Sequence, residues 1–549
     1  MKYILVTGGV ASGIGKGIVA SSIGALLRAA NQRVTAIKID PYLNVGAGCL
    51  SPYEHGEVFV LDDGSEVDLD FGNYERFLDS NLSGLNSITT GKINKHILNL
   101  DERGEYLGKT IQIIPHMTNA IQESIEKAAH NPLSDGHVAD ICIIELGGTI
   151  GDMEGMPFVE ALRQLQDRID KDDFCCCMVS LVPVVGPSKE QKSKPTQNAV
   201  KLLRSLNLSL DMILCRSESA LSENLRDKIY TTCGVRSSNV YSVPDLDSIY
   251  QVPLELHRQG MPQAISARLK IGVNTCDCRL KNWRDFCEIA IHAKKVINVA
   301  LVGKYTELKD SYISVAKALQ YACYVVNAKP KIHYIDSTLL ERHDTSAWNS
   351  LKTSDCLVVP GGFGMRGVEG MIRAIEWARN NRQPFLGVCL GFQMAVIEFA
   401  RHVLGIKNAH SDEFEPELRE RDELFEPIVT EMLEYIDPER KLGGTMRCGL
   451  RKTVFVKEDS ILKRLYGGKK VIEERHRHRY EIDSNYVDAL EAAGLKFVAK
   501  NEDGRRMEIL ELDEQKHPYF VGVQFHPEYL SRPFNPSPPY KGLICAAIK

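Results

Sequence analysis

Apolar residues in the first half of the chain gather in short continuous runs, separated by longer segments with helical spacing. The apolar runs lie at residues 3–7, 34–39, 141–145, 177–182 and 212–215, and segments such as 18–30 and 198–206 have the periodicity of helices. Strands that are apolar throughout are typical of parallel sheets covered by helices on both faces. The pattern therefore predicts an α/β fold built on a doubly wound parallel sheet.

The same pattern begins again in the second half of the chain. Polar residues around 270–294 interrupt it, and new apolar runs follow at 296–303, 355–360 and 384–388. We therefore expect two doubly wound parallel-sheet domains, residues 1–272 and 298–549, joined by a linker at 273–297. Residues 411–440 are rich in Glu, Asp and Arg, which predicts a solvated insertion in the second domain.

Length, charge and hydropathy argue against several classes of protein. The 549 residues suffice for two large domains. A net charge of −5, with 25% charged residues, argues against a polybasic nucleic-acid-binding protein. No apolar run approaches the roughly eighteen residues of a membrane helix, and residues 1–7 are typical of a short strand rather than of a signal peptide.

The fifteen cysteines predict reduced thiols rather than disulfides. Residues 175–177 are consecutive cysteines in an apolar run, and Cys142 and Cys215 lie in similar runs. Buried thiols are typical of proteins in the reducing cytoplasm, so we expect a cytoplasmic location. The cysteines at 276 and 278 have no second pair at zinc-finger spacing, and a zinc site is not expected.

Residues 387–391 read Gly-Val-Cys-Leu-Gly, between an apolar run and the helix-like segment 393–403. Small residues on both sides permit the strained turn that projects the middle side chain, here Cys389. Farther along, the sequence Phe-His-Pro-Glu contains His526 as a base and Glu528 as an orienting carboxylate. These residues predict acyl chemistry on an amide. For Cys389 alone, the alternative is a buried structural cysteine.

A glycine turn precedes this motif at residues 360–364, which read Pro-Gly-Gly-Phe-Gly after an apolar strand. Glycines let main-chain N–H groups approach the oxyanion of a tetrahedral intermediate. Together, the glycine turn, the Cys389 motif and the Phe-His-Pro-Glu sequence resemble a class I glutamine amidotransferase domain over residues 298–549. That resemblance implies that the cysteine releases ammonia from glutamine through a thioester.

The first strand leads into residues 8–17, which read Gly-Gly-Val-Ala-Ser-Gly-Ile-Gly-Lys-Gly before an amphipathic helix. The exposed N–H groups, the helix N-terminus and Lys16 favour polyphosphate binding. The spacing is one residue longer than in a Walker A loop, and Gly17 replaces the usual Ser or Thr magnesium ligand. We therefore expect the ligands of a magnesium ion to be Asp70 and Glu145, although either acid alone could be a cap or a surface charge.

Four further segments have unusual polar groups at strand ends or helix starts. They are residues 38–42 (Lys-Ile-Asp-Pro-Tyr), 51–60 (beginning Ser-Pro-Tyr-Glu-His), 145–154 (beginning Glu-Leu-Gly-Gly) and 192–197 (Lys-Ser-Lys-Pro-Thr-Gln). The carboxyl ends of parallel strands are where such sheets bind ligands. Two cations and two hydrogen-bonding side chains before a helix are well suited to a triphosphate.

This combination of motifs resembles the CTP synthase family over most of the chain. The resemblance implies that ATP phosphorylates the O4 carbonyl oxygen of UTP, and that ammonia from glutamine then displaces the phosphate. In the first domain it matches the phosphate loop (Ser12, Gly13, Ile14, Gly15, Lys16, Gly17), the lysine that assists phosphoryl transfer (Lys38), the magnesium ligands (Asp70, Glu145), a lid histidine (His55) and the UTP- or CTP-binding residues (Asp152, Glu154, Lys192, Lys194, Gln197, Lys228). In the second domain it matches the triad (Cys389, His526, Glu528), the oxyanion donors (Gly362, Leu390) and the glutamine-recognition residues (Gln393, Glu413, Arg479).

The same resemblance implies Mg²⁺ as cofactor, with ATP, UTP and glutamine as substrates. It also implies feedback inhibition by CTP, activation by GTP, and a homotetramer that can form filaments. Neither a nucleic acid nor a membrane is expected as a partner. Two alternatives stay open on the residues alone: another glutamine-dependent amidoligase acting through an acyl phosphate, and a non-catalytic assembly protein.

Overall fold

The structure is a computed structural model that describes residues 1–9, 11–187, 190–272, 277–420, 424–432 and 446–548. The chain forms two compact units: Met1–Ala47 with Asp70–Ile291, and Gly48–Leu69 with His292–Lys549. We call Gly48–Leu69 the inserted segment, because it packs with the second half of the chain. The predicted linker region contains helix α11 (Asp277–His292). Among the described residues, no helix is both long and apolar enough to span a bilayer.

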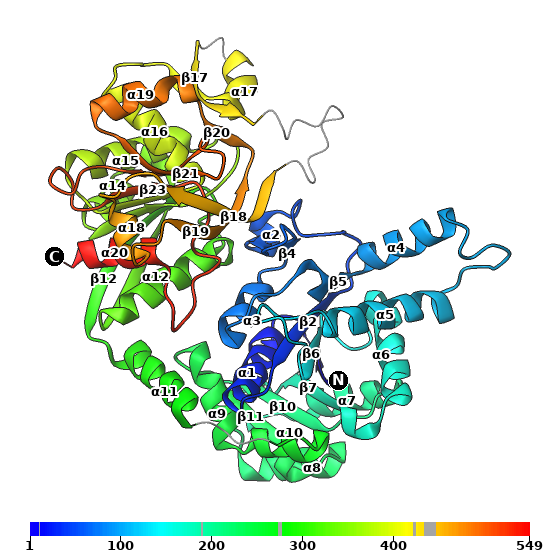
Figure 1. The fold of residues 1–549 in the computed structure, drawn as a ribbon. Helices are drawn as coiled ribbons and strands as arrows, with labels where there is room; N and C mark the ends of the chain where they lie inside the picture. Colours follow the sequence, from blue (N-terminus) through cyan, green and yellow to red (C-terminus); the bar gives the residue numbers. More distant parts are fainter. Residues whose placement is uncertain (10, 188–189, 273–276, 421–423, 433–445, 549) are drawn as a thin grey trace. The chain divides into compact units, whose positions relative to one another are not determined.

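The first unit is built on a sheet of seven described strands in which every neighbouring pair is parallel (Figure 1). The strand order is β11 (Val240–Pro244), β10 (Met212–Ser217), β7 (Phe174–Leu181), β1 (Lys2–Gly8), β6 (Ile141–Leu146), β2 (Val34–Asp40) and β5 (Ser87–Thr89). All five strands expected in this half are present, so the predicted parallel α/β sheet is confirmed.

Helices cover both faces of this sheet. Tyr3 and Leu5 of β1 face one hydrophobic cluster, which includes residues of α5 (Thr118–Ala129), α6 (Met156–Arg168) and α7 (Lys194–Ser205). Helix α1 (Lys16–Ala29) contacts β1, β2 and β6. Because successive side chains of a strand point to opposite faces, residues that are buried throughout β1 require helices on both sides.

The second unit contains a sheet of nine described strands. Its order is β13 (Ala328–Asp336), β12 (Lys295–Gly303), β14 (Cys356–Val359), β15 (Phe385–Val388), β23 (Phe520–Val523), β22 (Met507–Glu511), β21 (Lys496–Asn501), β18 (Arg447–Phe455) and β19 (Val471–His478). The pairs from β13 to β23 are parallel, whereas those from β23 to β19 are antiparallel. The α/β class is confirmed here too, but the sheet is parallel in one half only.

Alternate residues of β12 again bind two helical layers. Val299 and Leu301 pack with α12 (Ile313–Val325) and α20 (Pro538–Ala547), whereas Ala300 and Val302 pack with α15 (Val368–Asn380) and α16 (Leu390–His402). The layers place the start of α16 and the glycine turn after β14 at the carboxyl ends of parallel strands, where open α/β sheets bind ligands.

The prediction of a solvated insertion at 411–440 needs correction in the part that the structure describes, because this part forms regular elements anchored by buried residues. The described residues between 409 and 431 include β16 (Ala409–Ser411), the short helices η8 (Asp412–Phe414) and α17 (Glu415–Glu420), and β17 (Glu426–Glu431). Phe414, Leu418, Ile428 and Val429 are buried in the core. Isolated apolar residues among many charges were enough to anchor the segment. Residues 421–423 and 433–440 lie outside the described part of the chain.

Candidate active sites

Cys389 lies at the junction of β15 and α16, in a backbone conformation that residues with side chains rarely adopt. Its φ is 52° and its ψ is −101°. The neighbouring glycines are needed for close approach: a Cβ on Gly391 would lie 2.0 Å from the carbonyl oxygen of Val359, and one on Gly387 would lie 2.6 Å from that of Gly391. The turn therefore has the geometry of a nucleophile elbow.

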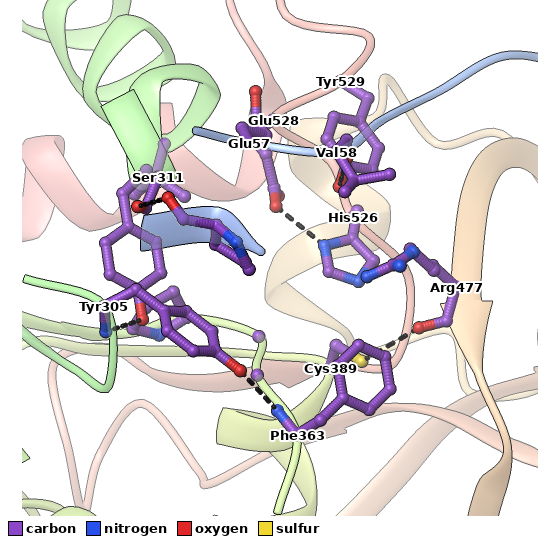
Figure 2. A pocket seen from close by; sticks show the side chains of 16 residues that line it. Glu57, Val58, Tyr305, Ser311, Phe363, Cys389, Arg477, His526, Glu528 and Tyr529 are labelled. Atoms are coloured by element: carbon purple, nitrogen blue, oxygen red, sulfur yellow. Dashed lines mark hydrogen bonds and ion pairs between the residues drawn. The ribbon is translucent and has the colours of Figure 1, made fainter. Parts of the chain in front are cut away.

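His526 and Glu528 follow strand β23 and lie beside this cysteine. Nδ1 of His526 is 2.8 Å from Oε1 of Glu528, whose second oxygen accepts a hydrogen bond from Tyr540 at 3.4 Å. Tyr529 stacks on the His526 ring with 5.1 Å between centroids. Figure 2 shows His526 between the Glu528 carboxylate and the Cys389 thiol. The structure thus brings together all three residues of the predicted triad.

The charge of His526 follows from these neighbours. Burial alone would lower the pKa of His526, but the Glu528 carboxylate and a Cys389 thiolate favour the imidazolium and raise the pKa to about 10. Among the described residues, Nε2 of His526 has no hydrogen-bond partner. The arrangement therefore favours a charged imidazolium at His526 beside Cys389, with one ring nitrogen left for the reacting groups.

The predicted oxyanion donors are neighbours. A Cβ on Gly362 would lie 3.5 Å from a methyl carbon of Leu390, which is the first residue of α16. A Cβ on Gly361 would lie 2.7 Å from Cε1 of His526, so the turn closely approaches the base. Main-chain N–H groups of a glycine turn and of a helix N-terminus are the usual donors to an oxyanion.

The predicted glutamine-recognition residues surround the same region. Gln393 donates hydrogen bonds to the carbonyl oxygen of Tyr480 and to Gln524, both at 3.2 Å. Glu413 accepts the N–H of Gly364 at 2.7 Å, and burial raises the pKa of Glu413 although the charge of Arg479 opposes it. A carboxylate with a guanidinium close enough to influence it can bind the amino and carboxylate groups of an amino acid.

Lys304 is a residue of this site that the motifs did not indicate. It follows β12, is 1% exposed, and donates hydrogen bonds to the carbonyl oxygens of Phe363, at 3.3 Å, and Gly364. Burial lowers the pKa of Lys304 to about 8. The ammonium therefore fixes the glycine turn. Its sequence signal was a lysine at the end of an apolar strand, the same signal that singled out Lys38.

The inserted segment also contributes to the pocket around the thiol. Pro52 lines it. Figure 2 shows Glu57 and Val58 of the same segment in the pocket with Tyr305 and Arg477. The sequence pattern places residues 51–60 in the nucleotide-binding domain, and no local pattern predicts these contacts because the partners lie far apart in the chain. His55 belongs to this segment and is exposed.

In the first unit, a glycine loop connects β1 to α1. Two of its glycines adopt a left-handed backbone conformation. Gly13 and Gly15 have φ values of 69° and 85°, and Gly15 caps the helix. Lys16 is buried and donates a hydrogen bond to the carbonyl oxygen of Gly148 at 2.7 Å. Burial lowers the pKa of Lys16. Ser12 is exposed at this loop and Ile14 is buried beneath it.

Lys38 lies among three carboxylates. Its Nζ is 2.6 Å from Asp70, 3.4 Å from Asp40 and 3.9 Å from Glu145. Burial raises the pKa of Glu145 to about 7, although Lys38 opposes the shift, and Tyr74 donates a hydrogen bond to the same carboxylate. The predicted phosphoryl-transfer lysine and both predicted metal ligands are therefore together.

The environment of Gly17 explains the departure from a Walker A loop. A Cβ on Gly17 would lie 2.7 Å from Oδ1 of Asp70, so the carboxylate fills the space that a Ser or Thr side chain would need. Hard oxygen ligands suit Mg²⁺, which usually completes its shell with phosphate oxygens and water. Among the described residues, no three His, Cys, Asp or Glu side chains are grouped to hold a metal ion by themselves. The residues present fit a magnesium ion shared with a nucleotide.

Four predicted nucleotide-binding residues meet in one open hollow, which also contains Gln191 and Ser222: Lys192, Lys194, Gln197 and Lys228. Lys194 is the first residue of α7. Asp152 does not line this hollow. Its carboxylate accepts hydrogen bonds from the N–H and hydroxyl of Thr149, at 2.8 and 2.6 Å, beside the glycine turn that Lys16 contacts. Glu154 lies in the exposed short helix η3 (Met153–Gly155).

Comparison with known proteins gives matches in both halves of the chain. Residues 2–271 match the family described as CTP synthase N-terminus, and residues 307–546 match the class I glutamine amidotransferase family. The chain is 53% identical to CTP synthase 2 of Bos taurus, 51% identical to CTP synthase 1-A of Xenopus laevis and 50% identical to CTP synthase 1 of Homo sapiens. Each of these alignments covers 100% of this chain and 93% of the relative.

Among solved structures, the glutaminase domain of Trypanosoma brucei CTPS with bound acivicin is 35% identical in sequence. The match covers 46% of this chain and 94% of that chain, with a TM-score of 0.42.

Proposed function

The chain belongs to the CTP synthase family, and we propose that its two sites act in sequence to aminate UTP with the amide nitrogen of glutamine. The observation that carries this conclusion is the presence of both sites in one chain, each at the carboxyl ends of its own sheet, combined with the alignment of the whole chain to CTP synthases. ATP drives the reaction, and CTP is the product.

The glutaminase site performs acyl transfer. The Cys389 thiolate attacks the side-chain amide carbon of glutamine, while the N–H groups of Gly362 and Leu390 stabilise the oxyanion. His526 donates its proton to the departing nitrogen and then activates water for hydrolysis of the thioester. Glu528, 2.8 Å from the ring, orients His526 and stabilises its charged form. Gln393, Glu413 and Arg479 hold the substrate's amino-acid end.

The synthetase site makes the carbonyl at position 4 of UTP reactive. A pyrimidine carbonyl oxygen is a poor leaving group, so its phosphorylation by ATP creates a better one before ammonia attacks. Phosphoryl transfer depends on positioning and charge neutralisation. Lys16 and Lys38 supply positive charge, and residues 12–17 supply main-chain N–H groups for the ATP phosphates. The hollow with Lys192, Lys194, Gln197 and Lys228 binds the UTP triphosphate.

Asp70 and Glu145 would hold Mg²⁺. When bound, the ion would neutralise the phosphate oxygens of the nucleotides and orient them for in-line transfer. Support for this assignment comes from the absence of a side chain at Gly17, which leaves room for the Asp70 carboxylate.

Regulation and assembly follow the family pattern in this proposal. CTP competes with UTP for the shared triphosphate residues, with Asp152 and Glu154 near the base or sugar. GTP activates glutamine hydrolysis, and His55 closes over the site. The enzyme acts in the cytoplasm as a homotetramer and can form filaments.

The alternatives from sequence analysis find less support. An amidoligase acting through an acyl phosphate could share both domain types, but the first half matches the CTP synthase amino-terminal family. A non-catalytic assembly protein has no need of a strained nucleophile beside an oriented histidine and glutamate, and all three are present.

The decisive experiment compares nitrogen sources. Purified protein with UTP, ATP and Mg²⁺ should form CTP, measured by absorbance, from either glutamine or an ammonium salt. Cys389→Ala should abolish only the glutamine-dependent reaction, because the thiol serves amide hydrolysis alone. Cys545→Ala, a half-buried cysteine of α20, is the matched control and should behave like the wild type. Loss of both reactions in a folded Cys389→Ala protein would contradict the two-site proposal.

A further inference from the structure

Strand β19 contacts both the nucleophile and the base of the glutaminase triad through its main chain. The carbonyl oxygen of Arg475 accepts the N–H of His526 at 2.8 Å, and that of Arg477 lies 3.6 Å from Sγ of Cys389. Residues two apart on a strand direct their carbonyl groups to the same side. A shift of β19 would therefore move the groups that position His526 and Cys389.

The side chains of the same two residues bind the inserted segment. Nε of Arg475 is 2.6 Å from Oδ1 of Asp62, and its guanidinium lies 5.4 Å from the centroid of the Phe59 ring. Arg477 forms a comparable pair with Glu66 at 2.7 Å. Each arginine therefore supports a triad residue with its main chain and holds the inserted segment with its side chain.

Asp62 is also fixed by its main chain. Its carbonyl oxygen accepts the N–H of Leu450 at 2.9 Å, and Leu450 is the residue of β18 that pairs with Arg475 of β19. The turn of the inserted segment fits here because position 449 is a glycine: a Cβ on Gly449 would lie 2.6 Å from the main-chain nitrogen of Gly64. Asp62 thus contacts β18 through its main chain and β19 through its carboxylate. The two contacts together fix the geometry of its ion pair with Arg475.

The pair with Asp62 matters because Arg475 has no access to water. Its side chain is 0% exposed, whereas that of Asp62 is 32% exposed. A buried guanidinium that loses this carboxylate gives up a charge-assisted hydrogen bond that water cannot replace unless the side chain moves, and both outcomes are costly. Movement of Arg475 would pull on the carbonyl group that holds the N–H of His526.

The other face of β19 is anchored within the second half of the chain. His476 and His478 are buried, and both contact Arg447, which forms an ion pair with Glu508 at 2.7 Å. The face that bears Arg475 and Arg477 is instead held by acidic residues of the inserted segment. Residues 48–69 lie within the match to the CTP synthase amino-terminal family, so the sequence of the synthetase half supplies this support.

We propose that Asp62 is a positioning residue for glutamine hydrolysis: through Arg475 it holds the main chain of His526, and the inserted segment thereby sets the activity of the triad. This inference rests on the proposed glutaminase function. Asp62 touches neither substrate nor the reacting atoms, so its effect is on the rate of the chemical step rather than on glutamine binding.

The test begins with Asp62→Asn, which keeps the size of the side chain and removes its charge. Glutamine hydrolysis by the full-length protein should lose about tenfold in kcat with KM unchanged, since a misplaced base weakens the transition state only. Ammonia-dependent CTP formation should be unaffected. Asp63→Asn is the matched control, because Asp63 accepts the N–H of Ser65 at 3.0 Å and asparagine retains that acceptor. Asp62→Glu should restore part of the lost rate.

A second measurement does not depend on nucleotide chemistry. Alkylation of Cys389 by iodoacetamide, without substrates, reports how well His526 stabilises the thiolate. It should be slower in Asp62→Asn than in Asp63→Asn. Adding Asp62→Asn to Arg475→Gln should then have little further effect, because the two residues act as one pair. Thermal unfolding of each variant shows whether it is folded.

The outcomes separate the inference from the proposed function. If the wild type forms no CTP from glutamine, the proposed function fails, and the alkylation rates still test the role of Asp62. If Asp62→Asn and Asp63→Asn have equal kcat and equal alkylation rates, the inference is overturned. An increase in KM with unchanged kcat would also overturn it, because that would assign Asp62 to binding.

Discussion

Single residues in both sites occupy positions where a neighbouring group leaves no room for a side chain. A Cβ on Gly17 would meet the Asp70 carboxylate at 2.7 Å, and a Cβ on Gly361 would meet the His526 ring at the same distance. In each case the absence of a side chain lets a catalytic group approach the main chain. Glycine is therefore required at these two positions because a neighbouring side chain lies too close for a Cβ, and not because the backbone has a left-handed φ.

Gly17→Ala should impair the synthetase reaction specifically. The added methyl group would displace the Asp70 carboxylate, so ammonia-dependent CTP formation should fall by about tenfold or more and require more Mg²⁺. Basal glutamine hydrolysis should persist. Steady-state rates at several Mg²⁺ concentrations measure the effect. Gly272→Ala is the control, because its added Cβ has no atom within 4 Å among the described residues other than its chain neighbours. Normal Mg²⁺ dependence in Gly17→Ala would show that Asp70 is not a ligand.

Glu528→Gln should change the pH dependence of Cys389 reactivity. The Glu528 carboxylate helps to raise the pKa of His526 to about 10, so its loss lowers that pKa and weakens the imidazolium that supports Cys389 reactivity. Alkylation of Cys389 at pH 7 should therefore be slower in Glu528→Gln than in the native protein. The difference should shrink toward pH 10, where native His526 also loses its proton. A pH-independent ratio of the two rates would contradict this account.

At the scale of elements, the site residues depend on where helices begin. Helix α7 begins at Lys194, so the first-turn residues Lys194 and Gln197 lie where the helix dipole favours an anion. Lys228 reaches the same hollow from α8 (Glu223–Cys233), the next helix in the chain. The hollow therefore depends on where both α7 and α8 lie, and the motif at residues 192–197 alone does not form it.

Lys194→Ala should weaken UTP and CTP binding together. Both nucleotides carry the same triphosphate, so loss of a shared charge-assisted contact raises the UTP KM and the CTP inhibition constant by a similar factor, about tenfold. Initial rates with varied UTP at several CTP concentrations give both values. Lys201→Ala, an exposed lysine of the same helix, is the control. Noncompetitive CTP inhibition with an unchanged UTP KM would refute a shared site.

At the scale of the whole molecule, the division of the chain does not follow the sequence order. The inserted segment interrupts the first unit and packs with the second, where Tyr53 donates a hydrogen bond to the carbonyl oxygen of Lys304 and Tyr529 donates one to that of Val58. The next residue after the segment is Asp70, the proposed magnesium ligand. One short stretch of chain therefore connects the synthetase site to the glutaminase triad covalently.

Oligomeric state is a further prediction at this scale. Light scattering of the 61.4 kDa chain should show a shift to four times the monomer mass when UTP and ATP are added with Mg²⁺. The reason is mass action, since nucleotides that bind the tetramer better than smaller forms promote assembly. Samples in the same buffer without nucleotide serve as the control. A protein that is fully active as a monomer would contradict the proposed assembly.

The sequence alone determined the fold class, and it predicted the glycine loop before α1, the turn at Cys389 and the three residues that the structure brings together there, Cys389, His526 and Glu528. These features are local: apolar strands alternate with helices, glycines mark tight turns, and the residues around Cys389 and Lys16 are short motifs with a direct physical reason. Strands such as β14 (Cys356–Val359) and β6 (Ile141–Leu146) lie where the apolar runs predicted them.

Only the tertiary structure decided which distant groups meet. It placed Asp70 in the space at Gly17, Lys304 under the glycine turn, and Asp62 of the first half against Arg475 of the second. It also buried Phe414 and Ile428 within a charged segment and turned half of the second sheet antiparallel. Periodicity reports which face of an element is apolar, but it does not report which element covers that face. Contacts between residues far apart in the chain depend on packing of the whole unit, and that packing leaves no signal in a local pattern.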